Sequence, residues 1–342
     1  MSKSKWAFMV ILVVGSILFI AGCGEGSDGD DGQADGADGE DVVLQFGTNL
    51  PESHIMAQGY QKMADEVEEN SNGRLKIDMY YSDQLGNERD VTESIAQDIG
   101  GMAAIGTGEM ARRDDTLLIF DAPYVFESLE HMLDFANGEE GQKIWDDFAE
   151  ETNIRNLGLM YYGARHVTTA NTEVHTPEDL NGVSLRVPDQ PMPLAYGEAL
   201  GANATPMELG ELYLALQQGV VDGQENPLPT IHGNGFNEVQ NNVILTGHVI
   251  AATGFVISEE KYQNLPEDLR TILDEAVETA VEDISADVVA TEAEILEEFA
   301  EQGVNIIEPD LDAFRESSEY IYDEYEDVWG EGLYETIQGV AE

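Results

Sequence analysis

The 342-residue chain has few basic residues: 15 lysines and arginines stand against 69 aspartates and glutamates, for a formal net charge of −54. Proteins that bind nucleic acid need a basic surface, so this composition excludes that class of partner. The acidic residues are spread along the whole chain, which is typical of halophilic proteins, whose surface charge keeps them soluble in concentrated salt. A protein that is acidic for other reasons and lies outside the cytoplasm is the alternative.

Cysteine occurs only once, at Cys23, so no disulfide can form within the chain. The N-terminus also lacks a full membrane span, because the apolar run at residues 6–20 is shorter than the ~20 residues that a spanning helix needs. This run follows two lysines and leads into the sequence IAGC at 20–23, which has the form of a lipobox. We therefore predict a lipoprotein-type signal peptide at residues 1–22 and a lipid on Cys23. An uncleaved N-terminal anchor is the alternative.

Residues 23–41 contain almost no apolar side chains and consist mainly of glycine, aspartate and glutamate. Such a segment cannot bury apolar surface, so we expect a disordered tether. Its aspartate spacing does not match a calcium-binding loop. The remaining residues, 42–342, are numerous enough for two lobes with separate cores.

Signatures of catalysis are missing as well. The chain has no G-x-S-x-G nucleophile elbow and no P-loop, and its six histidines do not show zinc-ligand spacing. One G-x-G-x-x-A match at residues 106–111 is weak by itself. A pair of catalytic carboxylates cannot be identified among 69 acids. We therefore expect no enzyme, no cofactor and no metal, with a secreted hydrolase as the less favoured alternative.

Apolar periodicity predicts strands that alternate with helices in the N-terminal part of the chain. This alternation is typical of a mostly parallel sheet with helices on both faces, an α/β fold. A pattern at residues 266–302 predicts one helix of ~55 Å, long enough to extend along both lobes. Strands are predicted at 42–47, 75–81, 102–105, 157–162, 183–187, 243–246 and 251–257, and further helices at 54–70, 91–99, 129–150, 191–200 and 209–218.

Two arginines lie in uncharged, strand-like surroundings: Arg165 in GARH (163–166) and Arg186 in VSLRVP (183–188). Strand alternation places Arg186 on the face opposite its apolar neighbours. A guanidinium can hold a carboxylate or a phosphate with two parallel hydrogen bonds. Each arginine is therefore a candidate for ligand binding, and an ion pair with a nearby acid is the alternative for both.

Three segments resemble the DctP-like solute-binding proteins of tripartite ATP-independent periplasmic (TRAP) transporters: GARHVTTAN (163–171), TPEDLNGVSLRVP (176–188) and ELYLALQQGVVDGQENP (211–227). The resemblance covers roughly residues 42–340. It implies a two-lobed periplasmic-binding-protein-like fold with a ligand cleft between the lobes. The lobes implied are 42–162 with 251–285, and 163–250 with 286–342.

The resemblance also implies a function. A protein of this kind captures a small carboxylate ligand outside the cytoplasm and delivers it to TRAP membrane permease subunits, without chemistry on the ligand. A ligand-sensing protein for a membrane receptor is the alternative.

By the same resemblance, Arg186 is the main carboxylate clamp, Arg165 a second cation near the ligand, and Asn226 a ligand contact. Glu225 is expected to hold the surrounding loop. Two further ligand contacts, Asn49 and Glu109, follow predicted strands, where a crevice at the strand ends is expected. Turn or capping roles are the alternatives for these two. The sequence does not specify which organic acid is bound.

Overall fold

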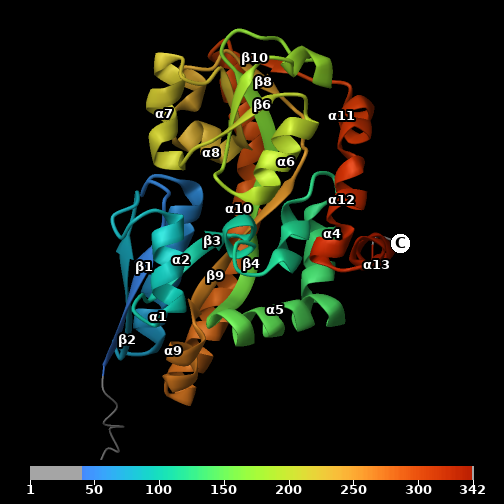
Figure 1. Cartoon of the computed structure of the whole chain (residues 1–342). Helices are drawn as coiled ribbons and strands as arrows, with labels where there is room; N and C mark the ends of the chain where they lie inside the picture. The colour runs from blue at the N-terminus through green and yellow to red at the C-terminus, as the bar shows by residue number, and fades with distance from the viewer. Residues whose placement is uncertain (1–40, 341–342) are drawn as a thin grey trace, which may run out of the picture. The chain divides into compact units, whose positions relative to one another are not determined.

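The computed structural model describes residues 41–340 (Figure 1). The predicted signal peptide at 1–22, the lipidation site Cys23 and all of the predicted tether except Asp41 lie outside the described residues. Within the described range, no helix combines the length and apolar character needed to cross a bilayer.

The first half of the sheet confirms the predicted alternation of strands and helices. Strand β1 pairs in parallel with both β2 and β3. Helix α2 begins at a capping box between Asn87 and Asp90, which satisfies backbone N–H groups at its first turn. The elements are β1 (Val42–Gly47), α1 (Ile55–Asn70), β2 (Leu75–Tyr80), α2 (Glu88–Ala96), β3 (Met102–Gly106) and α3 (Thr107–Met110).

The centre of the sheet is antiparallel, which differs from the expected mostly parallel sheet. Strand β9 (Ile250–Ser258) pairs antiparallel with β3 and with β4 (Ile154–Thr169). The strand predicted at 157–162 therefore continues, and Arg165 lies inside it. A register shift occurs between Tyr161 and Gly163. Gly163 has φ 126°, and a Cβ there would lie 2.5 Å from Cβ of Pro227, so only glycine fits this bulge.

The second half of the sheet continues from β4 in the order β4-β7-β5-β6, while β8 pairs with β4 and β10. Residues 223–227 of the DGQENP segment, expected as a loop, form a fully buried strand that pairs with β4 and β5. The elements are β5 (Ser184–Val187), α6 (Pro191–Ala199), β6 (Asn203–Pro206), α7 (Leu209–Gln218), β7 (Gly223–Pro227), α8 (Leu228–Gly233), β8 (Asn242–Ile244) and β10 (Asn305–Ile307).

The long helix predicted from the sequence is confirmed as α10 (Glu267–Glu301), which has 35 residues. It packs against α1 of the first half and against α8 and β10 of the second half (Figure 1). Side chains of α10 also hold the β4 bulge. Ser285 Oγ accepts the Tyr161 N–H at 3.0 Å, and Glu292 Oε1 accepts the Ala164 N–H at 3.2 Å. Helix α9 (Glu259–Asn264) precedes α10.

The helix predicted at 129–150 is two helices, α4 (Leu129–Asn137) and α5 (Glu139–Thr152), because the backbone at Gly138 is extended. They pack with the short helix η1 (Asp115–Asp121) and with the C-terminal helices around one aromatic-rich core. The C-terminal helices are α11 (Leu311–Ser318), α12 (Tyr320–Trp329) and α13 (Leu333–Val340). The lobe boundaries given in the sequence analysis stay predictions.

Candidate ligand-binding site

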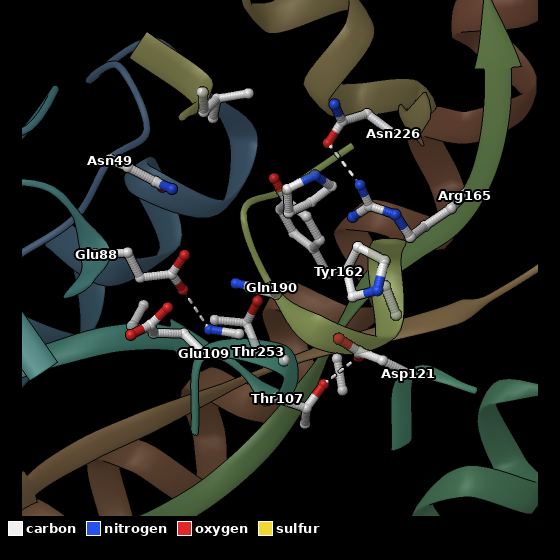
Figure 2. A pocket seen from close by; sticks show the side chains of 18 of the residues that line it. Asn49, Glu88, Thr107, Glu109, Asp121, Tyr162, Arg165, Gln190, Asn226 and Thr253 are labelled. Atoms are coloured by element: carbon white, nitrogen blue, oxygen red, sulfur yellow. Dashed lines mark hydrogen bonds between the residues drawn. The ribbon is translucent and has the colours of Figure 1, made fainter. Parts of the chain in front are cut away.

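A pocket lies where the two halves of the sheet meet, and all five predicted ligand-binding residues line it. Arg165, Arg186 and Asn226 come from β4, β5 and β7, while Asn49 follows β1 and Glu109 lies in α3. Figure 2 shows Arg165 and Asn226 on one side of the pocket and Glu88 and Glu109 on the other. The topology thus brings together side chains that are far apart in the sequence.

Arg186 is a buried cation, with only 3% of the residue exposed, and few protein groups balance its charge. Its Nε donates to the carbonyl oxygen of Met207 at 2.8 Å. Within residues 41–340, no carboxylate lies at ion-pair distance from Arg186, and its terminal nitrogens donate no hydrogen bond. Burial lowers the pKa of Arg186 to about 10, so the guanidinium is still charged at neutral pH. Its two terminal nitrogens are therefore without a protein acceptor among the described residues, and binding of an anion by Arg186 stays a prediction.

Arg165 differs from Arg186, because its charge is already neutralised. The guanidinium holds Glu225 with two hydrogen bonds, of which the one from Nη2 to Oε1 is 2.8 Å long. Both side chains are buried. Burial lowers the pKa of Arg165, but the Glu225 carboxylate outweighs this effect, so the pKa is raised overall. The ion pair considered as the alternative for Arg165 is therefore present, and a ligand contact by Arg165 stays a prediction.

Glu225 supports this ion pair and does not merely hold a loop. It lies in β7 and also accepts a hydrogen bond from His248, with 3.2 Å between Oε2 and Nε2. The other ring nitrogen of His248 is 2.9 Å from the Thr246 hydroxyl. Burial raises the pKa of Glu225, but the opposing effects of Arg165 and His248 are larger together, so the pKa is lowered to about 2. Glu225 is thus ionised, and this matches a neutral His248, whose pKa is lowered by burial.

Asn226 is 2% exposed, and hydrogen bonds to both atoms of its side-chain amide fix the orientation of that amide. Its Nδ2 donates to Gln224 Oε1 at 2.6 Å, and its Oδ1 accepts from Arg165 Nη2 at 3.3 Å. Gln224 in turn donates to the Thr168 hydroxyl at 2.9 Å. The side-chain amide of Asn226 is therefore held in one orientation. A polar group that is already fixed loses little conformational entropy when a ligand binds.

The opposite side of the pocket carries carboxyl groups. Glu109 is 5% exposed and accepts a hydrogen bond from Arg112 Nε at 2.8 Å. Glu88 accepts the Gly106 N–H at 2.6 Å. Burial, followed by repulsion from Glu109, raises the pKa of Glu88 to about 8, so this group is largely protonated at neutral pH.

Two more carboxyls line the pocket, those of Asp121 and Glu208. Asp121 accepts a hydrogen bond from the Thr107 hydroxyl at 2.6 Å, and burial raises its pKa. Gly108 allows Asp121 to approach, because a Cβ there would lie 2.2 Å from Asp121 Oδ2. The pocket is thus polarised, with a guanidinium at one end and carboxyls at the other.

Sequence reasoning missed the acidic residues of the pocket, Glu88, Asp121, Asp189 and Glu208. Asp189 follows the LRVP segment directly, so its position beside Arg186 was available as a signal. The other three offered no local pattern that separates them from the remaining acids. Among residues 41–340, no group of three or more His, Cys, Asp or Glu side chains is arranged to hold a metal ion.

Comparison with known proteins gives a consistent result. Residues 46–327 match the family model DctP, described as bacterial extracellular solute-binding protein, family 7. A sialic acid-binding periplasmic protein of Vibrio cholerae is 33% identical over 295 residues, which cover 85% of this chain and 91% of that protein.

Solved structures agree with the sequence relatives. A TRAP periplasmic solute-binding protein of Roseobacter denitrificans with bound 3-deoxy-D-manno-oct-2-ulosonic acid has a TM-score of 0.84 at 32% identity, covering 88% of this chain and all of that one. A sugar acid-binding protein of Advenella mimigardefordensis in complex with galactonate has a TM-score of 0.84 at 25% identity, covering 88% and 98%.

These relatives are solute-binding proteins and not enzymes, as expected from the sequence. The fold is the two-lobed α/β fold of periplasmic solute-binding proteins, with the pocket in the cleft between the lobes and α10 extending along both. The chain belongs to the DctP family, the extracytoplasmic solute-binding subunits of TRAP transporters.

Proposed function

We propose that this protein captures a small organic acid that carries one carboxylate and several hydroxyl groups, and delivers it to a TRAP membrane permease. The observation that carries the proposal is the polarity of the pocket. A buried Arg186 with free terminal nitrogens lies at one end, and the carboxyls of Glu88 and Glu109 lie at the other.

The arginine end supports recognition of the ligand carboxylate. Arg186 is the proposed clamp, because its planar fork matches the two oxygens of a carboxylate. Arg165, although paired with Glu225, is proposed as a second hydrogen-bond donor near the ligand carboxylate, and Asn226 offers a fixed amide beside it. A ligand carboxylate would supply the counter-charge that Arg186 lacks within the protein, which makes this contact strong in a site shielded from water.

The carboxyl end argues against a second carboxylate on the ligand. An anionic group placed near Glu109 and Glu208 would meet like charges in a partly buried setting. Hydroxyl groups fit better, since they donate to carboxylate oxygens and accept from a protonated Glu88. Sialic acid, 3-deoxy-D-manno-oct-2-ulosonic acid and galactonate, which the relatives' names give, each combine one carboxylate with several hydroxyls. Asn49 and Glu109 are the proposed contacts at this end.

The proposal includes the setting of the protein. A lipid on Cys23 would anchor it to the outer face of the cell membrane, and residues 24–41 would form the tether. The 69 acidic residues support a protein that works in concentrated salt, where the screening length falls to ~3 Å at 1 M. Surface charge then repels an anionic ligand only weakly, whereas the buried Arg186 keeps most of its attraction.

A ligand screen tests the proposed function. Thermal unfolding in molar salt should shift upward with hydroxylated monocarboxylates such as galactonate, 3-deoxy-D-manno-oct-2-ulosonic acid and sialic acid. A ligand at 100 times its dissociation constant stabilises a protein by about 2.7 kcal/mol. Succinate and malate should give a smaller shift or none. A larger shift with these dicarboxylates would contradict the proposal.

A further inference from the structure

Asp189 lies in the segment that joins β5 to α6, three residues after the proposed clamp Arg186, and it is held by two arginines of the other half. Arg89 of α2 donates from Nη2 to Asp189 Oδ2 at 2.8 Å. Arg112, just after α3, places its Nη2 3.7 Å from Asp189 Oδ1. Both carboxylate oxygens of Asp189 therefore face a guanidinium.

These ion pairs cross the pocket. Helix α2 follows β2 and α3 follows β3, so both arginines belong to the first half, whereas Asp189 is attached to β5 of the second half. Asp189 also lines the pocket itself. The two halves cannot separate at the pocket without breaking the contact between Asp189 and the arginines.

The position of Asp189 is fixed by the local backbone. Pro188 precedes it, and the Gln190 N–H bonds to the Pro188 carbonyl at 2.8 Å in a tight turn. Pro191 then begins α6. Because proline restricts its own backbone and that of the preceding residue, this segment has few alternative conformations. A movement of Asp189 is thereby coupled to β5, which carries Arg186.

The side chain of Arg112, across the pocket from Asp189, is also held in one orientation. Arg112 Nε donates to Glu109 Oε2 at 2.8 Å, so Glu109 holds the guanidinium that faces Asp189. The chain has only 15 basic residues among 342, yet two of them converge on this one carboxylate. Among residues 41–340, no other carboxylate has two arginines at ion-pair distance, which marks the contact as specific to this place.

We propose that Asp189 acts as a latch residue: its ion pairs with Arg89 and Arg112 hold the two halves together over a bound ligand and slow ligand release. Asp189 is a positioning residue, since its two oxygens are already used by arginines. The proposal concerns how the pocket closes, and its ligand assay uses the organic acid class proposed above.

The test compares Asp189→Asn with wild type, using 3-deoxy-D-manno-oct-2-ulosonic acid as the probe. We expect the dissociation rate in low salt to rise about 3- to 10-fold, because partly exposed ion pairs contribute modestly and most affinity changes appear in dissociation. The association rate should change less than about twofold. In molar potassium chloride the difference in dissociation rate should shrink but persist, because a screening length of ~3 Å weakens the Arg112 interaction at 3.7 Å more than the hydrogen bond from Arg89 at 2.8 Å.

Asp78→Asn is a matched control. It breaks the Lys76–Asp78 pair, which at 2.9 Å has nearly the same length as the Arg89–Asp189 pair at 2.8 Å. The side-chain exposures also match, 48% and 39% against 47% and 43%. Both residues of the control pair lie in β2, so it does not cross the pocket. Asp78→Asn should leave the dissociation rate unchanged.

Arg89→Gln and the double variant Arg89→Gln/Asp189→Asn complete a cycle. A latch requires that the two changes are not additive, with the double variant close to Asp189→Asn alone. Additive effects, or a dissociation rate unchanged by Asp189→Asn, would overturn the proposal. A change confined to the association rate would overturn it too, because it would indicate long-range attraction and not closure.

Hydrogen exchange on the ligand-free protein separates this proposal from the proposed function. Asp189→Asn should speed amide exchange in residues 106–112 and 186–190, which meet at the latch, and Asp78→Asn should not. If wild type fails to bind the probe, the ligand class is wrong, and this exchange experiment still decides the latch. Equal exchange in wild type and Asp189→Asn would count against it.

Discussion

The two ends of the pocket differ in how the protein balances the charges of their side chains. At the end formed by β4, β5 and β7, Glu225 neutralises Arg165, and Arg186 has no carboxylate partner among the described residues. At the end formed by α2 and α3, Glu88 lies close to Glu109 and Glu208, and burial together with their repulsion raises its pKa to about 8, which favours the protonated form at neutral pH. The comparison teaches that a charge with a partner inside the protein supports the structure, whereas a charge without one is available to a ligand.

Removing the counter-charge at the arginine end should have the largest effect. Glu225→Gln keeps the size of the side chain but leaves Arg165 buried without a partner. Loss of one member of a buried ion pair costs about 3–5 kcal/mol. Urea unfolding at constant salt measures this loss. Because the folded-state pKa of Glu225 lies below its ordinary value of 4.5, its contribution is present above pH 4.5 and is lost as the pH falls toward 2.

Glu259→Gln is the control for this prediction. It also breaks a two-bond pair between an arginine and a glutamate, with Arg155, but these side chains are 27% and 24% exposed. A more exposed pair contributes about 1 kcal/mol or less. Equal losses of stability for Glu225→Gln and Glu259→Gln would contradict the view that burial distinguishes Arg165.

Arg186→Ala should leave the free energy of unfolding nearly unchanged and remove tight ligand binding. The side chain donates only one hydrogen bond within the described residues, to Met207, and pairs with no carboxylate there. Truncating a charged partner in a buried pair costs roughly 2–5 kcal/mol, or about 30-fold to several thousand-fold in affinity. Calorimetry with the acid found in the screen measures this. The affinity of Arg186→Lys should lie between those of wild type and Arg186→Ala, because lysine keeps the charge but lacks the planar guanidinium. An unchanged dissociation constant for Arg186→Ala would end its assignment as the clamp.

The carboxyl end should show a smaller, pH-dependent effect. Folding raises the pKa of Glu88 from 4.5 to about 8, so between these values the folded protein binds a proton that the unfolded chain has released. The free energy of unfolding therefore falls as the pH rises through this window. Glu88→Gln, which resembles the protonated form, should remove this fall and stabilise the protein at pH 8.5 by at most about 4 kcal/mol, since each pKa unit corresponds to ~1.4 kcal/mol. If the free energy of unfolding changes with pH in the same way for both proteins, folding does not raise the pKa of Glu88, and the prediction is wrong.

Much of the arginine end was predictable because its residues stand out locally. Arg165 and Arg186 are rare cations in apolar strands, and Asn226 lies in a segment that resembles a family. The partner of Arg165 was not predictable in this way. Glu225 is adjacent to Asn226, but its role depends on β7 pairing with β4, and nothing in the DGQENP segment alone predicts that pairing.

The carboxyl end was hidden by the composition itself. Glu88 and Asp121 are two acids among 69, and only the tertiary fold places them in the pocket. The α/β class and the long helix α10 followed from periodicity, which is a local property. The antiparallel centre of the sheet did not, because pairing between β4 and β9 joins residues about 100 positions apart.

The bulge in β4 has a mechanical consequence. Gly163 lies where the strand passes from one half of the sheet to the other, and Ser285 and Glu292 of α10 grip the backbone on either side of it. The two lobes are therefore joined by a strand and a helix that are fastened to each other, and not by a loose linker. Because α10 is bonded to β4 on both sides of the bulge, we expect this joint to resist sliding of one lobe along the other. A lobe movement guided in this way would return Arg186 and Glu88 to the same alignment across the pocket.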